Sequence, residues 1–235
     1  MTGYKLNPNL KIKAHKIEEI NESVIVVDDF LESLSQVHMF SSKYAYLKPV
    51  GSDGTLYPGK RDIMPEAYNI VLKELIELLI NKGYITLLNN DIYIHSCKLS
   101  LVTQKANELI SQQKIPHIDS SDNKTFASVH YLSDQSLGGT AIYKYKPANL
   151  IKIDKGNEKV AYEMIKNIKN IAKSTDGYLN NNEYFEQVLK IEAQINRIVI
   201  YRSNLLHSAD LRNDATYNDD IATGRLSIAS FFRID

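Results

Sequence analysis

The feature that most constrains this chain is a series of short strand-like runs in its second half. Apolar, aromatic and β-branched residues gather in these runs, and polar or glycine-rich segments separate them. Leu137-Gly138-Gly139 lies between two of the runs and is typical of a hairpin turn. Many short strands with turn signals favour a β-sandwich or jelly roll. The runs cover residues 84–88, 92–101, 126–132, 140–146, 150–153, 196–202 and 225–233.

Helical periodicity flanks and interrupts this series. The clearest helix is predicted over residues 65–82, where apolar residues recur at spacings of three and four between Pro65 and Gly83. Residues 30–44 are loosely helical, and further helices are predicted over residues 158–173 and 183–195. We therefore expect a mainly β fold with flanking helices.

Length and composition fit one globular unit. The chain has 235 residues and 43% hydrophobic residues, which is typical of a folded domain. We expect a single domain over residues 1–235. Residues 1–83 would form a flank of helices and one strand, at residues 22–27, that supports the core. Residues 84–235 would form the jelly-roll core, with a helical insertion at about residues 157–195.

Charge and cysteine content narrow the functional classes. Lys plus Arg and Asp plus Glu both number 28, and this balance argues against nucleic acid or an anionic membrane as a partner. A single cysteine, Cys97, excludes a disulfide framework within one chain. The sequence contains neither a secretory signal nor an apolar run long enough to span a membrane. We expect a cytoplasmic protein that acts on a small molecule or peptide, and the oligomeric state is not predicted.

A His-x-Asp pair is the first candidate for chemistry. In a strand His117 and Asp119 would point to the same face and could bind one metal ion. The pattern is common by chance, and an ordinary polar turn is the alternative interpretation. A metal site also needs a third ligand, and the sequence offers His95, His130 and His207.

Further elements follow His-x-Asp in a fixed order. They are Tyr131-Leu132 in a strand, the Gly138-Gly139-Thr140 turn, the distal His207, and Arg225-x-Ser227 at the start of the last strand. Together they resemble the Fe(II)- and 2-oxoglutarate-dependent dioxygenases of the small bacterial prolyl-hydroxylase-like type. The resemblance covers about residues 115–233, and residues 26–31 also resemble the entry segment of that type.

The resemblance implies a double-stranded β-helix core, which is a jelly roll of the cupin kind. It implies that His117, Asp119 and His207 bind Fe(II), a ligand set that suits non-haem iron and leaves positions for 2-oxoglutarate and O2. Arg225 would bind the distal carboxylate of 2-oxoglutarate, with hydroxyl hydrogen bonds from Ser227 and Tyr131. The implied reaction couples decarboxylation of 2-oxoglutarate to hydroxylation, because Asp119 occupies the position that is a small residue in related halogenases.

Several alternatives stay open on the sequence. His95 and His130 are interpreted as structural, and Arg225 could be a surface residue. Which of Tyr143 and Lys144 faces the interior is not predicted, and the loop at residues 57–61 is either a plain turn or a substrate contact. A non-catalytic cupin-like binding protein and a zinc-dependent hydrolase are the two rival functions.

Overall fold

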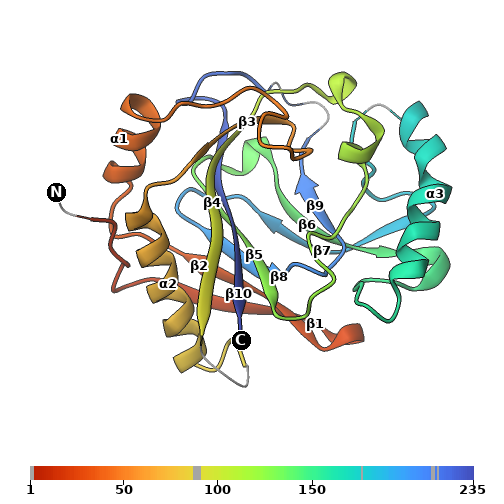
Figure 1. Cartoon of the computed structure of the whole chain (residues 1–235), viewed down its shortest axis with the longest axis horizontal. Coiled ribbons are helices and arrows are strands. Elements are labelled where there is room, and N and C mark those ends of the chain that lie inside the picture. The colour runs from red at the N-terminus through yellow and green to blue at the C-terminus, as the bar shows by residue number, and fades with distance from the viewer. Residues whose placement is uncertain (1–2, 87–90, 176, 213–214, 216) are drawn as a thin grey trace.

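Two antiparallel sheets form the core of the protein (Figure 1). The computed structural model describes residues 3–86, 91–175, 177–212, 215 and 217–235. In this described part, the larger sheet has seven strands in the order β1-β2-β8-β5-β10-β4-β3, and the smaller has three in the order β7-β6-β9. The larger sheet comprises β1 (Lys11–Ile17), β2 (Glu22–Asp28), β3 (Gly59–Ile63), β4 (Ile92–Val102), β5 (Thr125–Tyr131), β8 (Ile198–Arg202) and β10 (Arg225–Ile234). The smaller comprises β6 (Gly139–Tyr145), β7 (Phe185–Glu192) and β9 (His207–Asp210).

The two sheets pack face to face. Side chains from both enter one hydrophobic cluster, in which Tyr131 and Val199 of the larger sheet meet Ile142 and Ile191 of the smaller. Burial of such apolar surface contributes about 25 cal/mol per Å² and is the main force that holds two sheets together. The space between the sheets is therefore largely filled, and what remains open can serve as a site.

Helices cover the outer faces of the sheets. The helix α2 (Glu66–Asn81) packs Leu72, Leu75 and Leu79 against the larger sheet, and α1 (Ser35–Lys43) lies beside it (Figure 1). The helix α3 (Glu158–Ser174) lies at the other end of the molecule and packs against the smaller sheet. Short 3-10 turns lie at Glu18–Ile20, Ala106–Glu108, Ser111–Lys114, Gln135–Leu137 and Lys146–Ala148.

Strand β10 shows how alternation assigns the two faces of the larger sheet. Leu226, Ile228 and Phe232 point toward the helices and belong to their hydrophobic cluster. Arg225 and Ser227 point between the sheets, as period-two alternation requires. One strand thus supports the core on one face and carries polar groups on the other.

Most elements lie where the sequence predicts them. The helix predicted over residues 65–82 is α2, with Pro65 as its N-cap residue and Gly83 at a φ of 77° just past its end. The predicted strands at residues 92–101, 126–132, 140–146, 196–202 and 225–233 correspond to β4, β5, β6, β8 and β10. The mainly β expectation is therefore confirmed.

The helix predicted over residues 183–195 is wrong. The segment Phe185–Glu192 is β7, which pairs along its length with β6. Its Glu, Gln, Leu and Lys residues favour a helix only weakly, and sheet pairing overrides that preference. The helical part of the insertion predicted at residues 157–195 is therefore α3 alone.

Other differences concern short elements. Residues 150–153 make only single bridges, Tyr145 to Leu150 and Lys152 to Leu205, and form no strand. No strand is present at residues 84–86, and the rest of the strand expected at 84–88 lies outside the described residues. The expected flank contributes β1, β2 and β3 to the larger sheet, so it is part of the core.

Among the described residues, none of the helices combines the length and the apolar run required to cross a membrane.

Packing of α2 against the larger sheet leads to a stability prediction. Leu75→Ala should lower the free energy of unfolding by about 2–5 kcal/mol, because the buried side chain leaves a cavity. Ile70→Ala in the same helix removes a side chain that is 57% exposed. It should change the free energy of unfolding by about 0.5 kcal/mol or less. Equilibrium unfolding in denaturant measures both, and equal losses would contradict this packing.

Candidate functional site

Backbone pairing brings three potential metal ligands together. The N–H of His117 donates to the carbonyl of His207 at 2.9 Å, and the N–H of His207 donates back at 2.8 Å. The N–H of Asp119 donates to the carbonyl of Ser203 at 2.8 Å. The segment before β5 is thereby held against β9 and the loop that precedes it.

The three side chains meet as a metal site requires. One ligand atom each from His117, Asp119 and His207 lies within 4.8 Å of the others. The Nε2 atom of His207 is 3.3 Å from Asp119 Oδ2, and that of His117 is 4.0 Å from Asp119 Oδ1. Two imidazoles and one carboxylate on one side of a metal are typical of non-haem iron sites with open positions.

Hydrogen bonds select the ring nitrogen that each histidine offers. Nδ1 of His207 lies 2.9 Å from the carbonyl oxygen of Leu205, and Nδ1 of His117 lies 3.4 Å from that of Ile115. A carbonyl oxygen can only accept, so Nδ1 carries the proton in both rings. Nε2 is therefore the atom that each ring can offer to a metal, and in His207 it faces Asp119, which holds a proton on it while no metal is bound. Metal-binding histidines almost always have such a partner on the other nitrogen.

The electrostatics of the three groups also suit a cation. Partial loss of solvation and the neighbouring His207 lower the pKa of His117, although its side chain is 54% exposed, and this favours the neutral ring. Burial raises the pKa of Asp119, but the charge and hydrogen bond of His207 outweigh burial and lower it. Burial also disfavours charge on His207, yet Asp119 raises the pKa of that ring. A divalent metal would replace the proton that Asp119 holds on His207.

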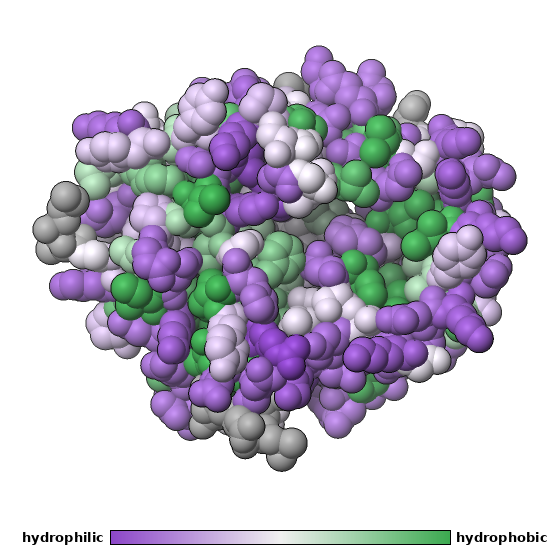
Figure 2. Space-filling model, in the orientation of Figure 1, coloured by the Kyte–Doolittle hydropathy of each residue, from purple (hydrophilic) through white to green (hydrophobic). Residues whose placement is uncertain are grey.

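The three ligands open onto a cavity of about 410 Å³ between the two sheets. Figure 2 shows a hollow near the middle of the visible face of the molecule, on the side where α3 lies in Figure 1. The inner face of β10 forms one wall with Arg225, Ser227 and Ala229, and the loop that carries Thr55, Leu56, Tyr57 and Pro58 forms another. The cavity is large enough for small molecules, which most enzyme pockets of a few hundred Å³ accept.

Arg225 is a buried cation without an anionic partner. Its side chain is buried, and among the described residues no carboxylate forms an ion pair with it. Nη2 donates to the carbonyl of Gly139 at 3.1 Å, whereas Nε is buried and makes no hydrogen bond. A buried charge without a counter-charge is costly, so this position favours an anionic ligand.

The glycine turn before β6 places the backbone carbonyl of Gly139 within reach of Arg225. Gly138 has a φ of 98°, which a residue with a side chain rarely adopts. A Cβ atom at Gly139 would lie 2.1 Å from the carbonyl oxygen of Ile191, so only glycine fits between β6 and β7. The turn thus sets the carbonyl that Arg225 contacts.

Tyr131 lies behind the cavity wall. Its hydroxyl shares a hydrogen bond of 2.5 Å with that of Thr140, and Thr140 itself lines the cavity. The ring lies 6.0 Å from the guanidinium carbon of Arg225. Burial raises the pKa of the Tyr131 phenol to about 12, so it stays protonated. The structure therefore brings Ser227 to the cavity and places Tyr131 one layer away.

The other histidines lie elsewhere. His130 is fully buried, with Nδ1 3.2 Å from the hydroxyl of Tyr68 and Nε2 3.2 Å from Asn196 Oδ1. His95 is exposed on β4. Among the described residues neither belongs to the metal cluster, as the sequence interpretation expects.

Some lining residues were not singled out from the sequence. Tyr201 lies with its ring 4.8 Å from that of His207, and nothing in its strand pattern marks it. Tyr57 lies in the loop that the sequence left as either a turn or a substrate contact. Its hydroxyl is buried without a hydrogen bond, and burial raises its pKa although Arg225 and Arg61 favour the ionised form. By contrast, Tyr143 is buried against Phe185 away from the cavity.

A family model described as a family of unknown function (DUF6445) matches residues 8–232. The chain belongs to this family. No curated protein matches the sequence.

Solved structures give the fold. HygX from Streptomyces hygroscopicus with nickel, 2-oxoglutarate and hygromycin B superposes with a TM-score of 0.51 at 11% identity, over 91% of this chain and 83% of HygX. The epimerase SnoN from nogalamycin biosynthesis, described as non-haem and α-ketoglutarate dependent, gives 0.49 at 11% identity, over 91% of this chain and 78% of SnoN. The viral collagen prolyl hydroxylase from Paramecium Bursaria Chlorella virus-1 gives 0.44 at 10% identity, over 90% and 96%. The superposition on HygX and the two antiparallel sheets confirm the fold class predicted from the sequence, a double-stranded β-helix with flanking helices.

The geometry of the three ligands predicts a loss of metal binding on substitution. His207→Ala should weaken binding of Ni(II), an air-stable probe, by more than the roughly 10–100-fold that loss of an outer partner costs. His95→Ala should bind Ni(II) as the unsubstituted protein does, because His95 lies outside the cluster. Calorimetric titration of metal-free protein measures both. Unchanged affinity in His207→Ala would remove this residue from the metal site.

Proposed function

We propose that this protein is an Fe(II)- and 2-oxoglutarate-dependent oxygenase, and that it hydroxylates a small molecule or a peptide side chain. His117, Asp119 and His207 would bind the iron. Arg225 and Ser227 would bind the distal carboxylate of 2-oxoglutarate. Tyr131 would act through Thr140, whose hydroxyl it holds at the cavity wall.

One observation carries the proposal. A three-ligand metal cluster and a buried guanidinium without a counter-charge open onto the same cavity. A dicarboxylate that binds the metal at one end and Arg225 at the other would satisfy both. Guanidinium suits the second contact because it binds a carboxylate through two parallel hydrogen bonds.

Bound iron and 2-oxoglutarate would supply the oxidation: one oxygen atom of O2 enters succinate, CO2 is released, and the other enters a C–H bond of the substrate. The chain's own residues would orient the reactants and exclude water. Nδ1–H of His117 and His207 would keep each ring turned toward the metal. The apolar side chains of Val129, Ala229 and Phe231 would limit water at the reacting atoms.

Hydroxylation is the favoured outcome because Asp119 retains its carboxylate. This group fills a metal position that a halide needs in the related halogenases. With Asp119 present, halogenation has no open position, and a hydroxylase or another oxidase remains.

Two rivals fit the cavity less well. A zinc-dependent hydrolase needs a general base beside the metal-bound water. Among the described residues that line the cavity, Asp119 is the only carboxylate, and it is a ligand. A non-catalytic cupin-like protein would have no need for the full ligand set together with Arg225.

Broader features of the proposal follow from the same cavity. We propose that residues 1–235 act as one catalytic unit, because Tyr57 from the first part and Arg225 from the second line the same cavity. A reducing compartment such as the cytoplasm would suit Fe(II) and the single Cys97. We propose no nucleic-acid or membrane partner.

The proposal predicts a specific spectroscopic signal. Anaerobic titration of 2-oxoglutarate into the Fe(II)-loaded protein should give a weak, saturable charge-transfer band, because the keto acid would chelate the metal. Asp119→Ala should lose the band, while Asp134→Asn, at an exposed carboxylate, should keep it. Absence of both band and binding in the unsubstituted protein would rule out the oxygenase function, and metal analysis would then separate the two rivals.

Arg225 has its own prediction. Arg225→Gln should raise the KM for 2-oxoglutarate roughly tenfold or more, because a charged hydrogen bond to the distal carboxylate is lost. The matched control is Arg233→Gln, which removes a guanidinium from the same strand at a surface ion pair with Asp235. Succinate release measures both values. An unchanged KM in Arg225→Gln would exclude Arg225 from the cosubstrate site.

A further inference from the structure

A second arginine lies on the same cavity wall as Arg225. Arg61 is on β3, at the edge of the larger sheet, and lines the cavity. Its backbone pairs with Ser100 on β4, and Ser100 pairs with Ser227 on β10. Residues paired across strands point to the same face, so Arg61 faces the interior two strands away from the proposed cosubstrate residues.

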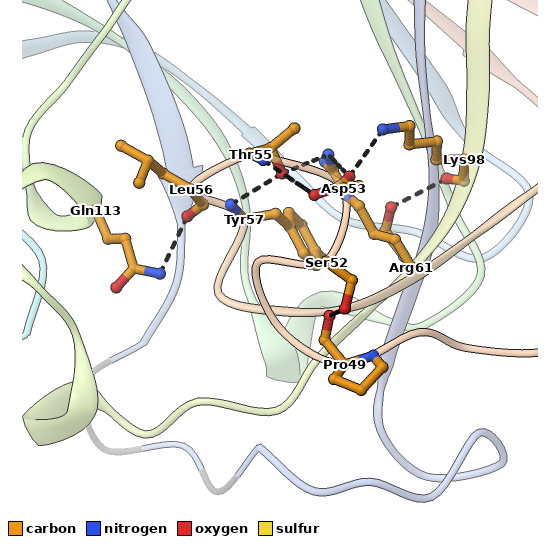
Figure 3. A network of polar contacts seen from close by, with 10 residues as sticks. Pro49, Ser52, Asp53, Thr55, Leu56, Tyr57, Arg61, Lys98 and Gln113 are labelled. Carbon is orange, nitrogen blue, oxygen red and sulfur yellow. Dashed lines mark hydrogen bonds and ion pairs between the residues drawn. The ribbon is translucent and has the colours of Figure 1, made fainter.

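The charge of Arg61 is only partly matched. Its side chain is 11% exposed, and its Nη1 lies 3.5 Å from Asp53 Oδ2, at the limit of a hydrogen bond. Lys98 Nζ lies closer to the same oxygen, at 2.8 Å (Figure 3). Thr55 donates to the other oxygen of Asp53. Asp53 is therefore the carboxylate partner of both Arg61 and Lys98, and its contact with Lys98 is the shorter one.

Arg61 also has donors to spare. Nη1 makes a second contact with Thr55 at 3.3 Å, but Nη2 makes no hydrogen bond to any described residue. Nε is buried and has no hydrogen-bond partner. The guanidinium stacks on Tyr57, with its carbon 4.0 Å from the ring centre, which holds its plane in place. A guanidinium that is held in place and has donors without partners is suited to bind an anion.

Charge balance indicates which anion. With iron and 2-oxoglutarate bound, the two carboxylates of the cosubstrate and Asp119 match the charges of Fe(II) and Arg225. Arg61 and Lys98 share Asp53, so one positive charge in this part of the cavity stays unmatched. A substrate with a single negative charge would neutralise it.

We propose that Arg61 binds a carboxylate of the substrate, so that the substrate class is a monocarboxylic acid. This inference rests on the proposed function and deepens it. The cavity wall also carries Ile118, Val129 and Phe231, which suit an aliphatic or aromatic body attached to that carboxylate. Arg61 would hold one end of the substrate and so determine which carbon lies near the metal.

The test uses probe acids that need no knowledge of the natural substrate. Protein labelled with 15N-arginine is loaded with Zn(II), a diamagnetic substitute for Fe(II), and with 2-oxoglutarate. Hexanoate and 3-phenylpropionate are titrated, each beside its primary amide, and phenyl phosphate is a third arm. The Nε–H signal of Arg61 is followed and is identified by its absence in Arg61→Gln.

We expect saturable shifts of this signal with the acids and at least roughly tenfold weaker binding of the amides, because the amide lacks the charge. In the unsubstituted protein the acids should also shift the Nε–H signal of Arg225, which lines the same cavity. In Arg61→Gln this shift should be lost, while the Kd for 2-oxoglutarate should stay within about twofold. The control is Lys60→Gln, which removes the neighbouring charge from the opposite side of β3, where Lys60 pairs with Asp219. It should bind the acids as the unsubstituted protein does.

Other results would overturn the inference. They are the absence of a shift with any acid, equal binding of acids and amides, acid binding that survives Arg61→Gln, or tighter binding of phenyl phosphate. Loss of 2-oxoglutarate binding in Arg61→Gln would place Arg61 in the cosubstrate site instead. If Arg61→Gln does not fold, Arg61→Lys replaces it and should weaken acid binding by losing the planar fork. Failure of 2-oxoglutarate to bind the unsubstituted protein counts against the proposed function alone, because the acid titration can be made with Zn(II) only.

Discussion

The reciprocal backbone pair between His117 and His207 is the interaction on which the site depends. These two residues are far apart in the chain, and neither lies in the middle of a long strand. Two hydrogen bonds fix their separation, and a third from Asp119 to Ser203 fixes the carboxylate beside them. Side-chain contacts then only choose the ring nitrogen. The metal cluster is thus a product of backbone geometry, which explains how it can be arranged before any metal is bound.

The larger sheet gives this cluster a polar neighbourhood without weakening the core. On β10, Leu226 and Ile228 pack on the helices, whereas Arg225 and Ser227 face the cavity. The same alternation places Arg61 on the inner face of β3. Two guanidinium groups therefore lie on one sheet face, two strands apart. This separation suits the two acids that we propose for the cavity.

How far the sequence predicts this molecule depends on the range of the interactions involved. The strands around His117 and Arg225 follow local alternation, and the ordered motifs support the fold class. The segment at Phe185–Glu192 was predicted as a helix because its local preference is helical, and only pairing with β6 makes it a strand. The sequence marked residues 57–61 as a loop that is either a turn or a substrate contact, but Gly59–Arg61 belong to β3. That Arg61 enters the cavity follows from register across three strands, which a single sequence does not display. Tyr57 is comparable: a turn-rich loop does not reveal which wall it will cover.

The way β6 and β7 are paired has a consequence for how this family can diversify. Tyr145 and Phe185 are opposite each other in the ladder, so the chain leaves the smaller sheet and returns to it at the same place. Everything between them, including α3, is in effect one long hairpin loop at the end of the molecule away from α2 (Figure 1). The closure entropy of such a loop changes slowly with its length. Relatives could therefore lengthen, shorten or replace α3, whereas Ile151 and Ile153 of the same segment hydrogen-bond Leu206 and Asn204 just before His207 and would have to stay.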